Sequence, residues 1–135
     1  MTTIADVRSA MAEAIKTTGL SASPYARATP TPPIAWVLRP AYDPRFVFGE
    51  RKVDYKFKVL VFAGGVEDQA AQTLLDAYCE PSGGVSLVQA LQDGANWPAD
   101  LVDMVQVVNV GENLVQQLAD GSTYWTVELD VEVIW

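Results

Sequence analysis

The side chains that could do chemistry in this 135-residue chain are few, and the most regular group is acidic. Glu128, Asp130 and Glu132 alternate with apolar residues, so an extended backbone places all three on one face at steps of about 6.6–6.8 Å. Three carboxylates in a row could hold Ca²⁺ or Mg²⁺. Such a row is more often the solvated face of a half-buried strand. We favour that interpretation and expect no bound metal or other cofactor.

The single cysteine, Cys79, has no histidine to activate it, because the chain contains none. A thiol becomes a strong nucleophile where a neighbouring base or positive charge lowers its pKa. Cys79 follows Leu75 and Tyr78 in a predicted helix, so we expect a small residue of the core. One cysteine also excludes an internal disulfide and a cysteine cluster for zinc. We therefore expect no catalytic residues and no enzyme.

Charge argues against several kinds of ligand. Gly64-Gly65 precedes a helix but lacks a phosphate-loop pattern, and Glu67 and Asp68 in the first turn would repel a phosphate. The net charge of −8 disfavours DNA, RNA or an anionic membrane as the main target. With neither a signal peptide nor a long apolar run, we expect a soluble protein made in a cytoplasm. Trp97, Tyr124 and Trp125 could form an aromatic platform on which nucleic-acid bases stack. The absence of basic residues in that half of the chain argues against such a site.

Two strands with clear alternation must position these side chains. Residues 124–135 carry bulky apolar side chains at every second position from Trp125 to Trp135, and residues 54–62 alternate in the same way. A period of two is typical of a half-buried β-strand. We expect the other elements to pair with residues 124–135 or to cover their apolar face. Trp135 is expected to be packed and not frayed.

The rest of the chain predicts helices and shorter strands. Their order, helix, strand, strand, helix pair, strand, strand, predicts a single α+β domain over residues 1–135. We expect a sheet of about four strands, largely antiparallel or mixed, with helices on one face. In the first half we expect a helix over 4–18 capped by Thr3, a Pro-rich extended arm over 20–33, a strand over 34–38 and a projecting loop or hairpin over 41–53. In the second half we expect a helix pair between 67 and 94, a strand over 101–110 and a connection over 111–121.

The composition favours association with a partner. Hydrophobic residues make up 50% of the chain, and charged residues only 19%, against about 25% in an average domain. Extra apolar residues with few charges indicate surface that another subunit covers, and a second copy is the simplest candidate. A somewhat apolar monomer is the alternative.

Charge is divided along the chain. All nine basic residues lie at or before Lys58, and twelve of the seventeen acids follow it. Folding could erase this division if strands from the two halves pair. In one interpretation, Lys56 and Lys58 lie across from Glu128, Asp130 and Glu132, where opposite charges on neighbouring strands contribute about 0.2–1 kcal/mol per pair.

The loop over 41–53 offers a second interpretation of the charge. Arg45, Arg51 and Lys52 lie in this loop together with Phe46 and Phe48, where no predicted strand pairs them with acids. We predict that the loop places a basic tip on the acidic surface of a neighbouring copy, a head-to-tail contact that can close into a ring. A loop that only covers the sheet edge is the alternative.

The sequence also resembles a known family. The matching features are the amphipathic helix with residues 7–12, the Pro-rich passage into a short strand, and Phe48-Gly49 ahead of the strand 54–59. The most specific match is residues 68–78 followed by 82–91, and an alternating strand closes the chain. Over nearly its whole length the chain resembles tail-terminator proteins of long-tailed bacteriophages, especially those of actinobacteria. The shared motifs are packing patterns and carry no catalytic signature.

The resemblance implies a virion structural protein, assembled in the host cytoplasm. Such proteins form a hexameric ring at the head-proximal end of the tail tube, end tube polymerisation and dock the head connector or stopper protein. Genomic DNA passes through the lumen without specific binding, which suits a net acidic protein. By the same resemblance, the Phe46–Lys52 hairpin contacts the tube protein or a neighbouring subunit. The alternatives are another head–tail joining protein, such as a stopper or adaptor, and a small enzyme or ligand-binding domain.

Overall fold

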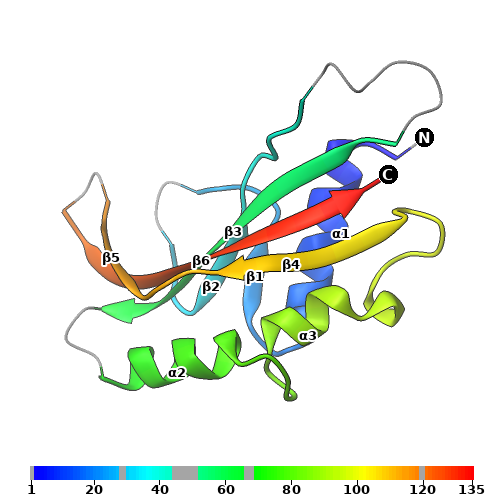
Figure 1. Cartoon of the computed structure of the whole chain (residues 1–135). Coiled ribbons are helices and arrows are strands. Elements are labelled where there is room, and N and C mark those ends of the chain that lie inside the picture. The colour runs from blue at the N-terminus through cyan, green and yellow to red at the C-terminus, as the bar shows by residue number, and fades with distance from the viewer. Residues whose placement is uncertain (1, 28–29, 44–51, 66–68, 119–120) are drawn as a thin grey trace.

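The computed structural model describes residues 2–27, 30–43, 52–65, 69–118 and 121–135. These residues form a mixed α+β fold, as predicted, with three α-helices and a six-stranded sheet (Figure 1). No helix among them has the length and apolarity needed to cross a membrane. The elements are α1 (Ile4–Lys16), β1 (Ser21–Ser23), β2 (Ile34–Val37), β3 (Asp54–Gly65), α2 (Gln69–Cys79), α3 (Leu87–Gln92), the 3₁₀ helix η2 (Gly94–Asn96), β4 (Met104–Val110), β5 (Leu114–Gln117) and β6 (Thr123–Ile134).

The sheet is mixed, with strand order β1-β2-β3-β6-β4. β1 and β2 are parallel, and the other pairs are antiparallel. The prediction of about four strands was too low, because β1 and β5 were assigned to the arm and to a connection. β1 has three small residues and β5 is exposed at every position, so neither shows alternation.

β3 and β6 form the centre of the sheet, in the alternating pattern that the sequence predicts. Their inward residues meet in register, with Val59 opposite Leu129 and Val61 opposite Val127. All four are at most 1% exposed. They belong to one hydrophobic core with the buried sides of the three helices. In Figure 1, α1 lies behind the central strands, while α2 and α3 run below them.

α1 begins where the sequence predicts and ends at Lys16, two residues before the predicted end at 18. Thr3 Oγ1 accepts a hydrogen bond from the Asp6 N–H at 3.1 Å, and the Asp6 carboxylate accepts one from the Thr3 N–H at 3.0 Å. This reciprocal capping satisfies N–H groups that a helix start leaves unpaired. These bonds lower the pKa of the Asp6 carboxyl. After the helix, Gly19 takes a φ of +92°, which glycine adopts without strain.

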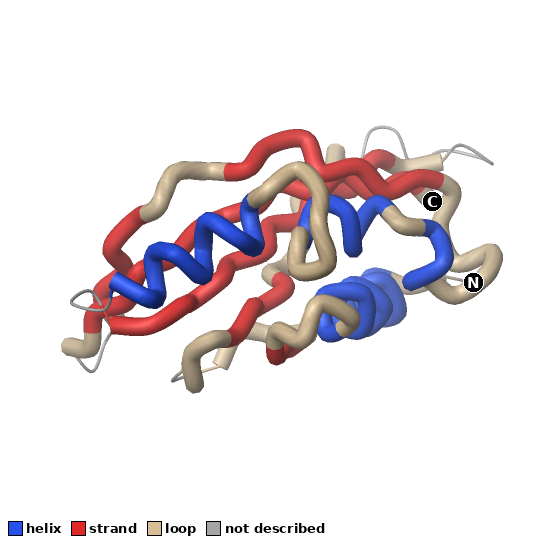
Figure 2. The backbone as a smooth tube through the Cα atoms, turned by 90° about the horizontal axis from the view of Figure 1, so that it is seen from below, coloured by secondary structure: helices blue, strands red, loops and turns tan. Residues whose placement is uncertain are grey.

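The turn after α3 is held by side chains. Ser86 caps the start of α3 by accepting from the Gln89 N–H at 3.2 Å. Beyond its end, Asn96 Nδ2 donates to the Ala90 carbonyl at 2.9 Å, and Trp97 Nε1 donates to the Leu91 carbonyl at 2.8 Å. These bonds fix η2 and Trp97 against the end of α3. Figure 2 shows the helices against the strands from below.

Candidate interaction surfaces

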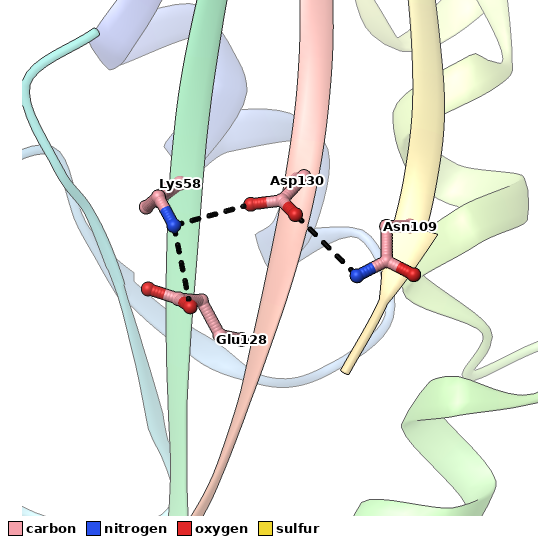
Figure 3. Close-up of polar contacts among 4 residues, drawn as sticks. All are labelled: Lys58, Asn109, Glu128 and Asp130. Carbon is pink, nitrogen blue, oxygen red and sulfur yellow. Dashed lines mark hydrogen bonds and ion pairs between the residues drawn. The ribbon is translucent and has the colours of Figure 1, made fainter. Parts of the chain in front are cut away.

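The carboxylate row lies on the exposed side of the sheet and meets a lysine from the other half of the chain. Lys58 is opposite Asp130 in the β3–β6 register. Its Nζ lies 3.5 Å from Glu128 and 3.6 Å from Asp130 (Figure 3). Asn109 Nδ2 on β4 donates to the Asp130 carboxylate at 3.4 Å. Glu128, followed by Asp130, raises the pKa of Lys58. The predicted cross-strand pairing is therefore confirmed for Lys58.

The same face holds a repulsive pair. Glu132 is opposite Lys56 in register, as predicted. A hydrogen bond with the Asp54 carboxyl raises the pKa of Glu132, and Lys56 only partly offsets this shift. Two carboxyl groups this close are stabilised when they share a proton. Within the described residues, no group of three or more Asp, Glu, Cys or His side chains is arranged to hold a metal ion.

Cys79 lies near the end of α2, half-buried against the core. Burial, together with the neighbouring carboxylates of Asp76 and Glu80, raises the pKa of its thiol to about 11. At neutral pH the group is therefore protonated, the opposite of what a thiol nucleophile needs. The prediction of a small core residue is confirmed in part, since Cys79 packs against the core but is only half-buried.

The predicted interface loop is described only at its base. Arg45, Phe46, Phe48 and Arg51 lie outside the described residues. Lys52, the remaining predicted contact, forms an ion pair of 3.1 Å with Asp103, and both side chains are more than half exposed.

The base of this loop is firmly built. Ala41 and Lys56 exchange backbone hydrogen bonds of 2.8 and 2.9 Å, and Val53 exchanges two with Trp135. Trp135 also stacks on Tyr55 with ring centroids 3.7 Å apart, and its Nε1 donates to the Thr2 carbonyl. The final residue is therefore packed, as predicted. Both chain ends lie at this end of the sheet (Figure 1).

The opposite edge of the sheet was not anticipated as a site. β4 lies along Leu129–Ile134 of β6, and β5 lies along Thr123–Thr126 on the same side. Together they form one interrupted border strand, here named the β4–β5 edge. Between them, the Gly111 N–H donates to the Glu128 carbonyl at 2.8 Å. A Cβ on Gly111 would lie 3.1 Å from that oxygen, so the close approach favours glycine.

This edge exposes apolar side chains. Val108, Leu114 and Val115 are 51%, 56% and 54% exposed, and Met104 is 37% exposed. Among the described strands, none pairs with the outer side of β4 or β5. Soluble proteins usually protect such borders with charges, proline or a covering segment. The sequence signal was present in the apolar content of 104–110 and in Leu114-Val115, but the strand pattern alone did not show that the residues lie on a border.

Two hollows accompany the β4–β5 edge on the helix side. The first, of about 310 Å³, lies beside Trp97, Asp100 and Met104. The second, of about 340 Å³, lies at the other end of β4, and we name it the β4 hollow. Between them, Gln92 Oε1 accepts a hydrogen bond of 2.9 Å from the Val107 backbone N–H. The β4 hollow is lined by Cys79, Pro81, Val88, Val107, Val108, Asn109 and Val110.

The chain matches no protein-family model and no curated protein sequence. Its function is therefore inferred from the fold, from these surfaces and from the resemblance in its packing motifs.

Proposed function

We propose that this protein is a structural subunit that assembles with copies of itself into a ring. In this proposal the ring sits at the head-proximal end of the tail tube of a long-tailed bacteriophage, and the chain has no catalytic role. The observation that carries the self-association is the β4–β5 edge, which combines exposed apolar side chains with a border that no described strand covers.

The edge supports assembly for two physical reasons. An open strand border offers backbone N–H and C=O groups to another chain. Covering exposed valine and leucine side chains removes apolar surface from water, which lowers the free energy of the assembly. At about 25 cal/mol per Å² of apolar surface, even a few such side chains contribute several kcal/mol when fully covered. A contact between two different surfaces of the same subunit can repeat until it closes into a ring.

The place of the ring is supported by the resemblance to tail terminators. On that basis the ring has six subunits, ends growth of the tube and receives the head connector, with DNA passing through its lumen. The net charge of −8 suits a lumen through which DNA slides, because acidic surfaces give phosphates little to hold.

Sedimentation equilibrium or native mass spectrometry of the purified protein tests the assembly. We expect a closed oligomer, with six as the expected number, at micromolar concentration. A monomer at every concentration up to the millimolar range would overturn the proposal.

Binding to purified partners tests the place in the particle. We expect the oligomer to bind the free end of a tail tube and to stop its elongation in vitro. A ring that binds the head connector but not the tube would instead favour a stopper or adaptor.

A further inference from the structure

The β4 hollow has the chemistry of a receptor for an apolar segment with basic flanks. Its lining is mainly aliphatic and comes from Pro81, Val88 and the C-terminal part of β4, residues 107–110. Val108 at its rim is 51% exposed. A volume of about 340 Å³ falls at the lower end of the range for ligand pockets, which suits one or two side chains of a peptide.

The backbone beside the hollow can hold an added strand. The border of β4 has no strand partner among the described residues, and the hollow flanks that border. Strand addition of this kind gives affinity through main-chain hydrogen bonds, while pockets for alternate side chains give specificity. The Val107 N–H is not free to bind an added strand, because it already donates a hydrogen bond to the Gln92 side chain.

The surroundings of the hollow are acidic. Asp76 and Glu80 lie close enough to Cys79, a lining residue, to act on its thiol. No lysine or arginine occurs after Lys58, so neither β4 nor its neighbouring helices supply a positive charge. A ligand with arginine beside its apolar residues would complement this side of the molecule.

One segment of the chain has that composition. Residues 45–52 contain Phe46, Val47 and Phe48 between Arg45 on one side and Arg51 on the other. Glu50 also lies in this segment, and Lys52 is already paired with Asp103 of its own chain, so the two arginines supply the positive charge. We propose that the β4 hollow of one copy receives residues 45–52 of a second copy, with aromatic side chains in the hollow and arginine near its acidic rim. The proposal rests on the self-association argued above and names the surfaces that meet. In an extended segment Phe46 and Phe48 point to the same side and Val47 to the other.

The single native cysteine makes the contact testable. Phe46→Cys and Phe48→Cys each add one thiol, which can pair with Cys79 in the hollow or with the same new cysteine of another copy. Adding Cys79→Ser to each variant separates the two cases, since only disulfides through Cys79 are then lost. Mild oxidation near pH 9, where more of the thiols ionise, is expected to give covalent dimers and higher oligomers on non-reducing gels. Ala26→Cys, at an exposed position after β1, is the matched control and should give no ladder through Cys79.

The outcomes separate this contact from the assembly itself. A wild-type monomer would overturn the proposed function together with this inference. A wild-type oligomer whose Phe46→Cys and Phe48→Cys variants form no intermolecular disulfide, or form one that persists when Cys79→Ser is added, would overturn only the inference. So would an internal disulfide without a ladder, since it would show residues 45–52 in the hollow of their own copy.

A second variant tests the receptor without a new thiol. Val108→Arg places a long charged side chain at the rim of the hollow and should weaken association by about tenfold or more. Ser9→Arg, on the exposed face of α1, is the control and should leave association within about twofold. Unchanged association of a folded Val108→Arg protein would also overturn the inference.

Discussion

The centre and the border of the sheet use similar residues in opposite ways. At the β3–β6 centre, Val59 and Leu129 are fully buried beneath the helices, while Lys58 and Asp130 pair on the other face. At the β4–β5 edge, equally apolar residues such as Val108 and Leu114 remain more than half exposed. The centre can stabilise the subunit by itself. The border gains the same kind of stabilisation only when something outside the subunit covers it.

The largest expected effect tests whether the two regions differ in their contribution to folding. Leu129→Ala removes a fully buried side chain and should lower the free energy of unfolding by about 3 kcal/mol. Val108→Ala should change it by less than about 0.5 kcal/mol, because the side chain is already half in water. Urea unfolding at low protein concentration measures both. Similar costs at the two positions would contradict the comparison.

The next prediction concerns what the border does for assembly. Leu114→Asp together with Val115→Asp should weaken association by at least about tenfold, because two carboxylates would be placed in an apolar contact. Sedimentation velocity across a dilution series measures the loss. Thr73→Asp, on the exposed side of α2, is a control of the same charge change per site. An oligomer of undiminished affinity in the double variant would show that the border is not the contact.

Charge reversal in the loop should have a smaller effect. Arg51→Glu is expected to weaken association severalfold, and added salt should do the same, because exposed ionic contacts are screened. Lys52 is paired with Asp103 in its own chain, so Lys52→Glu also breaks a contact within the subunit, one of little value between exposed groups. Sedimentation showing the same oligomer for Arg51→Glu plus Lys52→Glu at every salt concentration would remove the role of charge.

The sequence was informative where the two sides of a strand differ. β3 and β6 were predicted from their alternation, since one face of each is buried and the other is charged. The pairing of Lys58 with acids of β6 followed from the same pattern and from the charge division. The caps of α1 could also be predicted, because a capping box and a terminal glycine are local signals.

The elements that were missed lack such contrasts. β5 is exposed on both faces, so nothing in its residues distinguishes it from a loop. The β4 hollow joins Cys79 and Val88 to Val107–Val110, which are brought together only by the packing of α2 and α3 beside β4. Gln92 is ordinary in the sequence and becomes informative only when its side chain is seen on the Val107 N–H.

The smallest expected effect tests whether the charged face of the centre is fully satisfied. The pKa of Glu132 is raised in the folded protein, chiefly by its hydrogen bond with Asp54, despite Lys56 across the strand. A raised pKa means that this group stabilises the fold below its ordinary pKa and that the contribution is lost as pH rises through the folded value. Glu132→Gln should therefore stabilise the protein near pH 7, by at most about 0.5 kcal/mol for such exposed groups. Thermal unfolding should show the gain shrinking below pH 4.

Glu128→Gln is the contrasting control: it removes a partner of Lys58, so it should slightly destabilise the protein at pH 7. A Glu132→Gln protein that is less stable than wild type at pH 7 would show that Lys56 outweighs Asp54.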